Sequence, residues 1–270
     1  MVSFRAQSLW IWPILCVGCV EGANVETLVD ELRVVAIALE PPEAAPGESF
    51  TAALHVGSPS LSEISVAAWT CAGFGGDCLE QLVSRAAIAE GSAPLFEVEL
   101  QAPYEAAALL VEAEEFPISV WAMACEQGVC SVLDDIAEGV ADADVLADPT
   151  LALEALPLSG VSVARKSLWV SNRDEEERRE NPAILPQFDS PLQGRVAEPL
   201  ELAFDISGGA TEGYGYATGG GFEMSEYTVL DGVLSMSWYA PEAAGEYTIW
   251  VIAQSDEGGS AVWSSTVQVQ

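Results

Sequence analysis

The sequence has very few basic residues. Only 9 of its 270 residues are Lys or Arg, against 42 Asp or Glu, so the formal net charge is −33, and Lys166 is the single lysine. Proteins that bind nucleic acid neutralise phosphates with clustered cations, which this chain lacks. The composition therefore excludes nucleic acid as a partner and disfavours side-chain binding to anionic membrane surfaces.

Histidine is equally scarce. His55 is the only one, and it lies on the polar side of an alternating segment, where we expect an exposed residue rather than the base of a catalytic triad. Acidic residues are numerous, but no spacing singles out two of them as a glycosidase pair. Because 50% of the residues are hydrophobic, we expect the chain to fold rather than to remain an acidic disordered polymer.

No apolar run is long enough to span a membrane. The longest candidate follows Arg5, covers residues 9–17 and ends before Glu21, whereas a spanning helix needs about 20 apolar residues. This order of charge and apolar residues is typical of a signal peptide. Cys16-Val17-Gly18-Cys19 resembles a bacterial lipobox, although Leu is usual at its first position. An ordinary secretory peptide with two incidental cysteines is the alternative.

The lipobox resemblance implies a location. It makes residues 1–18 the signal peptide, Cys19 the lipid attachment site and residues 19–31 a lipidated tether. Val20 follows Cys19 in place of the Asp that resembles an inner-membrane retention signal, so the resemblance implies a lipid-anchored protein of the outer membrane. Acyl chains contribute about 0.8 kcal/mol per buried methylene, which anchors a protein without any basic patch.

Four further cysteines form two local pairs in the sequence: Cys71, Cys78, Cys125 and Cys130. An exported protein permits disulfides, and four cysteines allow three connectivities. Local pairing would close two loops, whereas pairing Cys71 with Cys125 would join two strands, as in immunoglobulin domains. The spacings C-x6-C and C-x4-C, with a single histidine, differ from those of zinc clusters, so we predict disulfides and no metal centre.

Most of the remaining chain alternates between apolar and polar residues. Segments 50–56, 200–206, 234–238 and 263–269 all follow this period of two, and turn-forming Pro and Gly residues separate them. Such segments are half-buried strands, and many short strands predict a β-sandwich or barrel. The sequence therefore predicts an all-β protein.

Several segments recur in the same order along the chain. The pattern of residues 48–56 recurs at 198–206, that of 96–103 at 234–241, and that of 118–124 at 247–253. Ile64 and Val66 align with Tyr214 and Tyr216, and residues 69–74 align with 217–222. The period is too long for a solenoid. We therefore predict two tandem domains of one fold, at residues 32–170 and 183–270, joined by a charged linker at 171–182 that we interpret as a solvated connector.

Tryptophans near cysteines favour an immunoglobulin-like sandwich. A period of two places Trp69 on one strand face with Cys71, and Trp121 with Cys125. Tryptophan packed on a cystine is typical of that fold, although the cysteine spacing differs from antibody domains and these could simply be large core residues. Residues 131–147 predict a short helix inserted in the first domain, and Tyr104–Glu114 is also helix-prone.

A set of short motifs extends along the whole mature chain. They are Glu40-Pro41-Pro42-Glu43, Pro46-Gly47-Glu48, Trp69-Thr70-Cys71, Asn181-Pro182, Trp238-Tyr239-Ala240-Pro241, Gly245, Trp250-Val251, Gly258-Gly259 and Trp263. With the lipobox, they resemble predicted envelope lipoproteins of myxobacterial type. The resemblance implies tandem immunoglobulin-like domains on the surface or in the periplasm, and it carries no known activity.

Three functional hypotheses follow. The favoured one is a non-catalytic envelope lipoprotein that acts as a binding or spacer module, with an unknown envelope protein or glycan as partner and no cofactor. The second is a carboxylate-based, carbohydrate-active enzyme. The third is a calcium-stabilised adhesion protein, whose candidate ligands lack the spacing of the twelve-residue calcium loop. These ligands are Asp134, Asp135, Asp142, Asp144 and Asp148.

Overall fold

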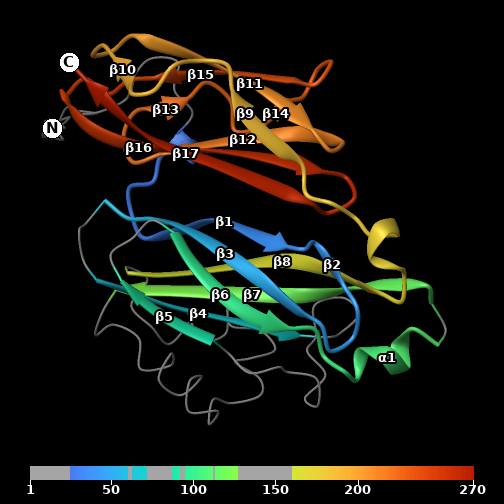
Figure 1. Ribbon diagram of the computed structural model, residues 1–270. Coiled ribbons are helices and arrows are strands. Elements are labelled where there is room, and N and C mark those ends of the chain that lie inside the picture. Colours follow the sequence, from blue (N-terminus) through green and yellow to red (C-terminus); the bar gives the residue numbers. More distant parts are fainter. Residues whose placement is uncertain (1–24, 60–62, 72–86, 92–94, 112, 127–159) are drawn as a thin grey trace, which may run out of the picture.

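The computed structural model describes residues 25–59, 63–71, 87–91, 95–111, 113–126 and 160–270. As the alternating sequence predicts, this part of the chain is almost entirely β-strand. Its strands form four sheets. Two sheets are built from residues 33–171, here called the N-terminal half, and two from residues 183–269, the C-terminal half, and Figure 1 shows one half stacked on the other.

The N-terminal half has a three-stranded and a five-stranded sheet. The smaller sheet has the order β1-β3-β6, formed by β1 (Arg33–Glu40), β3 (Ser49–Gly57) and β6 (Leu95–Gln101). The larger has the order β2-β8-β7-β4-β5, formed by β2 (Glu43–Ala44), β8 (Val161–Ser171), β7 (Glu115–Glu126), β4 (Ile64–Cys71) and β5 (Ala87–Gly91). Strand β2 is parallel to β8, and the other neighbours are antiparallel.

The C-terminal half has a four-stranded and a five-stranded sheet. The smaller sheet has the order β13-β15-β11-β9, formed by β13 (Gly221–Phe222), β15 (Val233–Tyr239), β11 (Pro199–Ser207) and β9 (Ala183–Pro186). The larger has the order β10-β17-β16-β12-β14, formed by β10 (Leu192–Gly194), β17 (Ser260–Val269), β16 (Gly245–Ser255), β12 (Ala210–Ala217) and β14 (Tyr227–Thr228). Strand β10 is parallel to β17, as β2 is to β8.

The two halves repeat one strand order. The order β1-β3-β6 recurs as β9-β11-β15, and β2-β8-β7-β4-β5 recurs as β10-β17-β16-β12-β14. The register repeats as well, because Leu54 pairs with Phe96 and Phe204 pairs with Leu234. The repeated sequence pattern therefore corresponds to a repeated strand order in the structure.

One segment of the sequence repeat is out of register. Trp69 lies opposite Trp121, and Tyr216 lies opposite Trp250, so the strand pairing aligns residue 69 with residue 216, an offset of 216 − 69 = 147. The alignment of Ile64 and Val66 with Tyr214 and Tyr216 was wrong by about three residues, and that of residues 69–74 with 217–222 was wrong by one, since 217 − 69 = 148. The apolar pattern is misleading here because β12 places small residues toward the core and its tyrosines away from it.

Each half has its own hydrophobic core. In β3 the four residues Phe50, Ala52, Leu54 and Val56 are all buried, as their alternation predicts. In β12 the inward positions are glycines, and a Cβ on Gly215 would lie 2.5 Å from the ring of Phe222. Large side chains from the opposite sheet therefore fill space that β12 leaves open.

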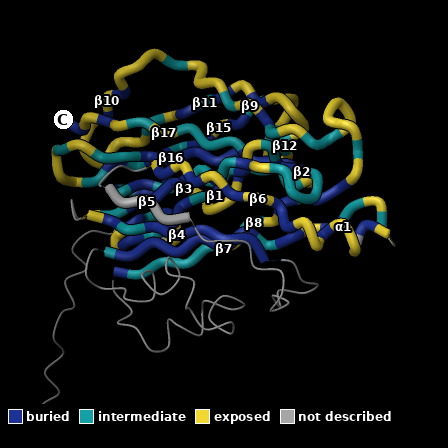
Figure 2. Tube along the Cα trace, turned by 60° about the horizontal axis from the view of Figure 1, so that its bottom comes forward, coloured by how far each residue is buried: buried dark blue, intermediate teal, exposed yellow. Residues whose placement is uncertain are grey.

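The tryptophans beside the cysteines face away from the core between the sheets. Ile64, Val66 and Ala68 of β4 belong to that core, so the alternate residues Trp69 and Cys71 lie on the other face. They are nevertheless fully buried, and Figure 2 shows β4 and β7 buried along most of their length. The prediction that they share a face is confirmed, but their placement inside the sandwich was wrong.

Several predicted features lie outside the described residues. These are the signal peptide, Cys19, Cys78, Cys130, the helix at 131–147 and the acidic residues at 134, 135, 142, 144 and 148. The helix-prone segment Tyr104–Glu114 does contain one turn of helix, α1 (Ala106–Leu109). Among the described residues, no helix is both long enough and apolar enough to cross a membrane.

Candidate functional site

The two halves meet through a small apolar contact, here called the junction. Val29 lies just before the N-terminal half, and Val35 lies in its first strand, β1. Both pack on Trp250 and Ile252 of β16. Gly57 ends β3 at this contact, and a Cβ there would lie 2.8 Å from Val29 and 3.2 Å from Trp250. A side chain at residue 57 would therefore push the halves apart.

The segment before β1 also belongs to the junction. The 3-10 helix η1 (Val25–Thr27) leads to Thr27, whose hydroxyl accepts a hydrogen bond of 2.8 Å from the backbone N–H of Phe222. The N–H of Val29 donates to the carbonyl of Ala217 at 2.8 Å. Residues 25–31, predicted as part of a free tether, are therefore partly fixed to the C-terminal half.

The segment after β8 is held by a buried carboxylate. Glu43 of β2 is 0% exposed and accepts hydrogen bonds from the Ser171 hydroxyl, from Nη1 of Arg179 at 3.1 Å and from the Arg179 backbone N–H at 3.0 Å. Nη1 of Arg173 lies 3.5 Å from the same carboxylate. A buried charge is stable only when it is paired in this way.

Glu115 of β7 completes this ion-pair cluster. Its two oxygens accept hydrogen bonds from Arg179 at 2.7 and 2.9 Å, and it also pairs with Arg173. The hydrogen bond from Arg179 lowers the pKa of Glu115 and raises the pKa of Arg179. The Arg179 guanidinium also lies 4.0 Å from the centre of the Trp169 ring. Residues 173–179 are thus fixed to the N-terminal half.

Asn181 then connects the two halves directly. Its amide nitrogen donates to the carbonyl of Leu39 at 2.6 Å and to Glu40 at 2.8 Å, and its oxygen accepts from the N–H of Ser260 at 2.9 Å. The interpretation of residues 171–182 as a solvated connector was wrong. The turn η3 (Glu175–Glu177) is exposed to solvent. The arginines on either side of it, Arg173, Arg178 and Arg179, instead form ion pairs with the N-terminal half.

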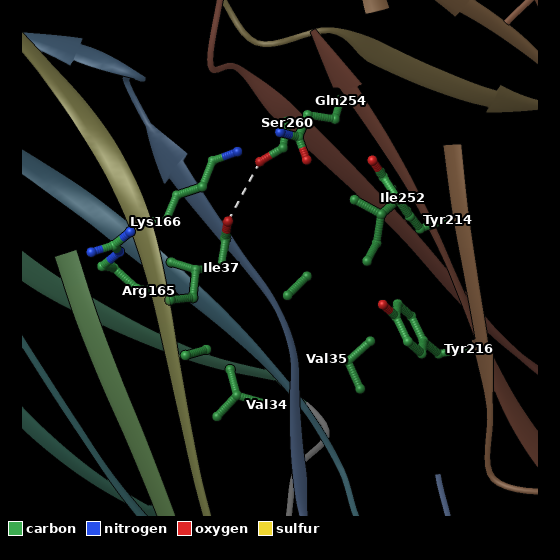
Figure 3. Close-up of a pocket in the computed structure, with 12 residues that line it drawn as sticks. Val34, Val35, Ile37, Arg165, Lys166, Tyr214, Tyr216, Ile252, Gln254 and Ser260 are labelled. Carbon is green, nitrogen blue, oxygen red and sulfur yellow. Dashed lines mark hydrogen bonds between the residues drawn. The ribbon is translucent and has the colours of Figure 1, made fainter. Parts of the chain in front are cut away.

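A pocket of about 220 Å³ opens beside the junction. Strands β1 and β8 form one wall, and β12, β16 and the start of β17 form the other, as Figure 3 shows. Tyr214, Tyr216 and Ile252 project from the C-terminal half, and Val35 and Lys166 from the N-terminal half. None of the residues that line the pocket is Asp or Glu.

The ionisable groups of the pocket are perturbed. Burial lowers the pKa of Lys166. The Tyr214 hydroxyl donates to Glu212 at 2.5 Å, and this hydrogen bond, with burial, raises the pKa of Tyr214. Figure 3 shows Lys166 extended toward Ser260, whereas the Arg165 guanidinium points away and lies 5.5 Å from the ring centre of Trp121.

A second hollow, of about 420 Å³, adjoins the pocket at the two tyrosines. It has acidic lining residues, among them Glu26, Asp30 and Glu226. Arg33 lies there, 4.9 Å from the ring centre of Tyr216. The tyrosines therefore separate an acidic hollow from a pocket without carboxylates.

His55 is buried, which corrects the prediction of an exposed residue. It is 8% exposed, and burial lowers its pKa to about 4. The strand period places His55 on the same face as Gly57, which meets Val29 and Trp250 at the junction. A polar residue on a strand face was thus read as exposed, because the sequence does not reveal that another half covers this end of the strand.

The register of β4 and β7 excludes one disulfide. Cys71 lies opposite Ser119 and Cys125 opposite Ser65, so the two cysteines are 125 − 119 = 6 residues apart along the strands, about 20 Å. Disulfides require Cα atoms within about 7 Å. A bridge from Cys71 to Cys130 would require Cys130 to lie within about 7 Å of Cys71, although it follows Cys125 by only 130 − 125 = 5 residues, which reach about 17 Å at most. Local pairing has no such requirement.

Sequence reasoning missed the residues that form this site. Glu43 and Arg179 come together from β2 and the segment after β8, and Lys166 of β8 lines the separate pocket beside the junction. One signal was available, because three of the nine basic residues fall within residues 171–182. In so acidic a chain, a local concentration of arginine indicates pairing rather than a solvated segment.

No protein-family model matches the sequence, and no curated protein matches it. Among solved structures, it is similar to the D0-D1 domain of intimin, with 10% identity, 87% of this chain and 98% of that chain covered, and a TM-score of 0.25. It is also similar to the Yersinia pseudotuberculosis adhesin InvE, with 9% identity, coverage of 86% and 58%, and a TM-score of 0.24. A third is dimeric latent PorU from Porphyromonas gingivalis, with 11% identity, coverage of 90% and 24%, and a TM-score of 0.27. At these scores we draw no functional conclusion from the likeness.

Proposed function

We propose that this protein is a non-catalytic bacterial envelope lipoprotein in which two tandem immunoglobulin-like sandwiches form a rigid binding and spacer module. Lipid on Cys19 would anchor it in the outer membrane. The partner would be an envelope protein or a glycan. The observation that carries the proposal is the fixed junction, because an ion-pair cluster and Asn181 hold the linker against both halves.

The immunoglobulin-like assignment is supported by the strand order. In immunoglobulin-like sandwiches the second and fifth strands share one sheet, and the third, sixth and seventh strands share the other. When β1 and β2 are counted together as the first strand, β9 and β10 likewise, and β13 and β14 together as the fourth, both halves have this arrangement. In the N-terminal half these are β3 with β6, and β4 with β7 and β8. The first strand is divided, since β1 pairs with β3 and β2 pairs in parallel with β8.

The spacer role is supported by the contacts at the junction. A flexible linker would let the halves rotate, whereas Asn181 bonds to Leu39 and to Ser260 on opposite sides. A Cβ on Gly258 of the C-terminal half would lie 2.8 Å from the Trp169 indole of the N-terminal half, so the halves also touch there. A fixed angle between two sandwiches is what a spacer requires.

The carboxylates of the ion-pair cluster do not favour the enzyme hypothesis. A glycosidase acid needs a carboxyl group whose pKa is raised. Arg179 has the opposite effect on Glu115, because its hydrogen bonds stabilise the charged form. Both Glu43 and Glu115 are already bonded to arginine, so we interpret this cluster as structural.

Metabolic labelling with radioactive palmitate tests the lipid anchor. The wild-type protein should incorporate label, and the Cys19→Ala variant should not. Cys16→Ala is the matched control, because it removes a cysteine three residues away and should retain the label. Absence of label from the wild-type protein, or equal label in Cys19→Ala, would refute the anchor.

A further inference from the structure

Lys166 is a cation that has no counter-ion among the described residues. It is the single lysine of a chain with 42 acidic residues. Within the described residues, it forms no ion pair and no hydrogen bond through its amine, although all three arginines of the linker do. A partly buried ammonium group without a partner is unfavourable. Such a group is expected where a bound anion supplies the missing charge.

The surroundings of Lys166 are suited to an anion. No acidic side chain lines the pocket, and the Glu212 carboxylate beside it accepts a hydrogen bond from the Tyr214 hydroxyl. The side-chain amide of Gln254 makes no hydrogen bond to the described residues, and the Ser260 hydroxyl donates only a long one, 3.4 Å, to the Ile37 carbonyl. Both groups are therefore available to a ligand's polar atoms.

Two aromatic rings form the opposite side of the pocket. Tyr214 and Tyr216 alternate with the inward-facing glycines of β12, so they project away from the core, and they lie across the pocket from Lys166 in Figure 3. Aromatic faces pack against the C–H groups of a sugar ring, while amide and hydroxyl groups bond to its hydroxyls. The combination of ring faces, Gln254, Ser260 and one ammonium group matches a sugar that carries a carboxylate.

We propose that this pocket binds a single uronic acid unit of an acidic glycan, with Lys166 paired to its carboxylate and the ring packed against Tyr214 and Tyr216. This deepens the proposed binding role by naming its ligand class. A volume of about 220 Å³ is below the range of pockets for drug-sized ligands and limits the occupant to about one ring. An acidic peptide would offer the carboxylate but would not use the two ring faces.

Calorimetric titration of the purified full-length protein tests the proposal. The probes are glucuronate, glucose, which lacks the carboxylate, and acetate, which lacks the ring. Glucuronate should bind, and glucose and acetate should each bind at least about tenfold more weakly. Lys166→Met should weaken glucuronate binding at least about tenfold, because it removes the charge and keeps an unbranched apolar chain.

Arg195→Met is the matched control for the loss of one positive charge. Arg195 has an 80% exposed side chain outside the pocket, so this variant should bind glucuronate as the wild type does. Absence of glucuronate binding, equal binding of glucose or acetate, or full affinity in Lys166→Met would overturn the proposal. None of these results would affect palmitate labelling, so failure of the lipid anchor can be told apart from failure of the pocket.

A second measurement needs no variant. Lys166 carries the single lysine amine of the chain, so its acetylation by acetic anhydride can be followed by mass spectrometry of one peptide. Glucuronate should slow acetylation of Lys166 severalfold, and glucose should not. Equal rates with and without glucuronate would also overturn the proposal.

Discussion

Removal of the Arg179 guanidinium should be the most costly single change at the linker. The side chain of Arg179 is 12% exposed, and that of its partner Glu43 is 0% exposed. The substitution Arg179→Met keeps the aliphatic part of the side chain and leaves the Glu43 carboxylate with weaker compensation. The Ser171 hydroxyl, the backbone N–H of residue 179 and Arg173 at 3.5 Å would remain as partners.

The size of the effect follows from the burial of the pair. Breaking a buried ion pair by removing one partner costs about 3–5 kcal/mol, because the other charge stays buried. Since Glu43 keeps three partners, we expect the lower end of that range, about 3 kcal/mol, including the lost contact with Trp169. Glu43→Gln combined with Arg179→Met should cost less than the sum of the two single changes, because no uncompensated charge remains.

Urea unfolding followed by tryptophan fluorescence measures this cost. The matched control is Arg195→Met, whose partner Glu198 lies 3.8 Å away and whose pair is largely exposed. Exposed pairs contribute about 0–1 kcal/mol, so the control should lower the free energy of unfolding by less than about 1 kcal/mol. If Arg179→Met costs no more than Arg195→Met, or if added salt removes its effect, the account of a buried ion-pair cluster is wrong.

Two further results are expected. The pKa of His55 is about 4 in the folded protein, against an ordinary value of 6.5. As the pH falls, the unfolded chain therefore takes up this proton before the folded protein does, and the free energy of unfolding should decrease between pH 6.5 and pH 4. The loss should reach about 2 kcal/mol by about pH 5. It should be absent in His55→Gln; an equal loss in that variant, measured by urea unfolding, would contradict the assignment. Peptide mapping without reduction should find Cys71 linked to Cys78 and Cys125 to Cys130; a peptide that joins Cys71 to Cys130 would contradict the geometric argument.

The strands were largely predictable from the sequence, because apolar residues recur at every second position wherever one face of a sheet is buried. Segment 200–206 has one buried and one more exposed side, and segment 50–56 has one fully buried side, so the apolar pattern is visible in the residues themselves. The repeated strand order was also visible, since equivalent core positions in β3 and β11 all carry apolar residues.

The site was not predictable because it depends on contacts between distant segments. Glu43 and Arg179 are separated by 136 residues, and nothing in either local sequence identifies the other. His55 illustrates the same limit, since it is buried on the strand face that Gly57 presents to the junction. A polar residue in an alternating strand indicates solvent only when no second sheet or domain covers that face.

The attachment of residues 27–29 determines how the molecule would bear load. These residues bond to Phe222 and Ala217 of the C-terminal half immediately before the chain enters β1 of the N-terminal half. Tension applied at the N-terminus would therefore reach both halves at the point where they meet, instead of passing through one to reach the other. A protein tethered in this manner would resist being drawn out end to end, because the pull must first shear a contact shared by both halves.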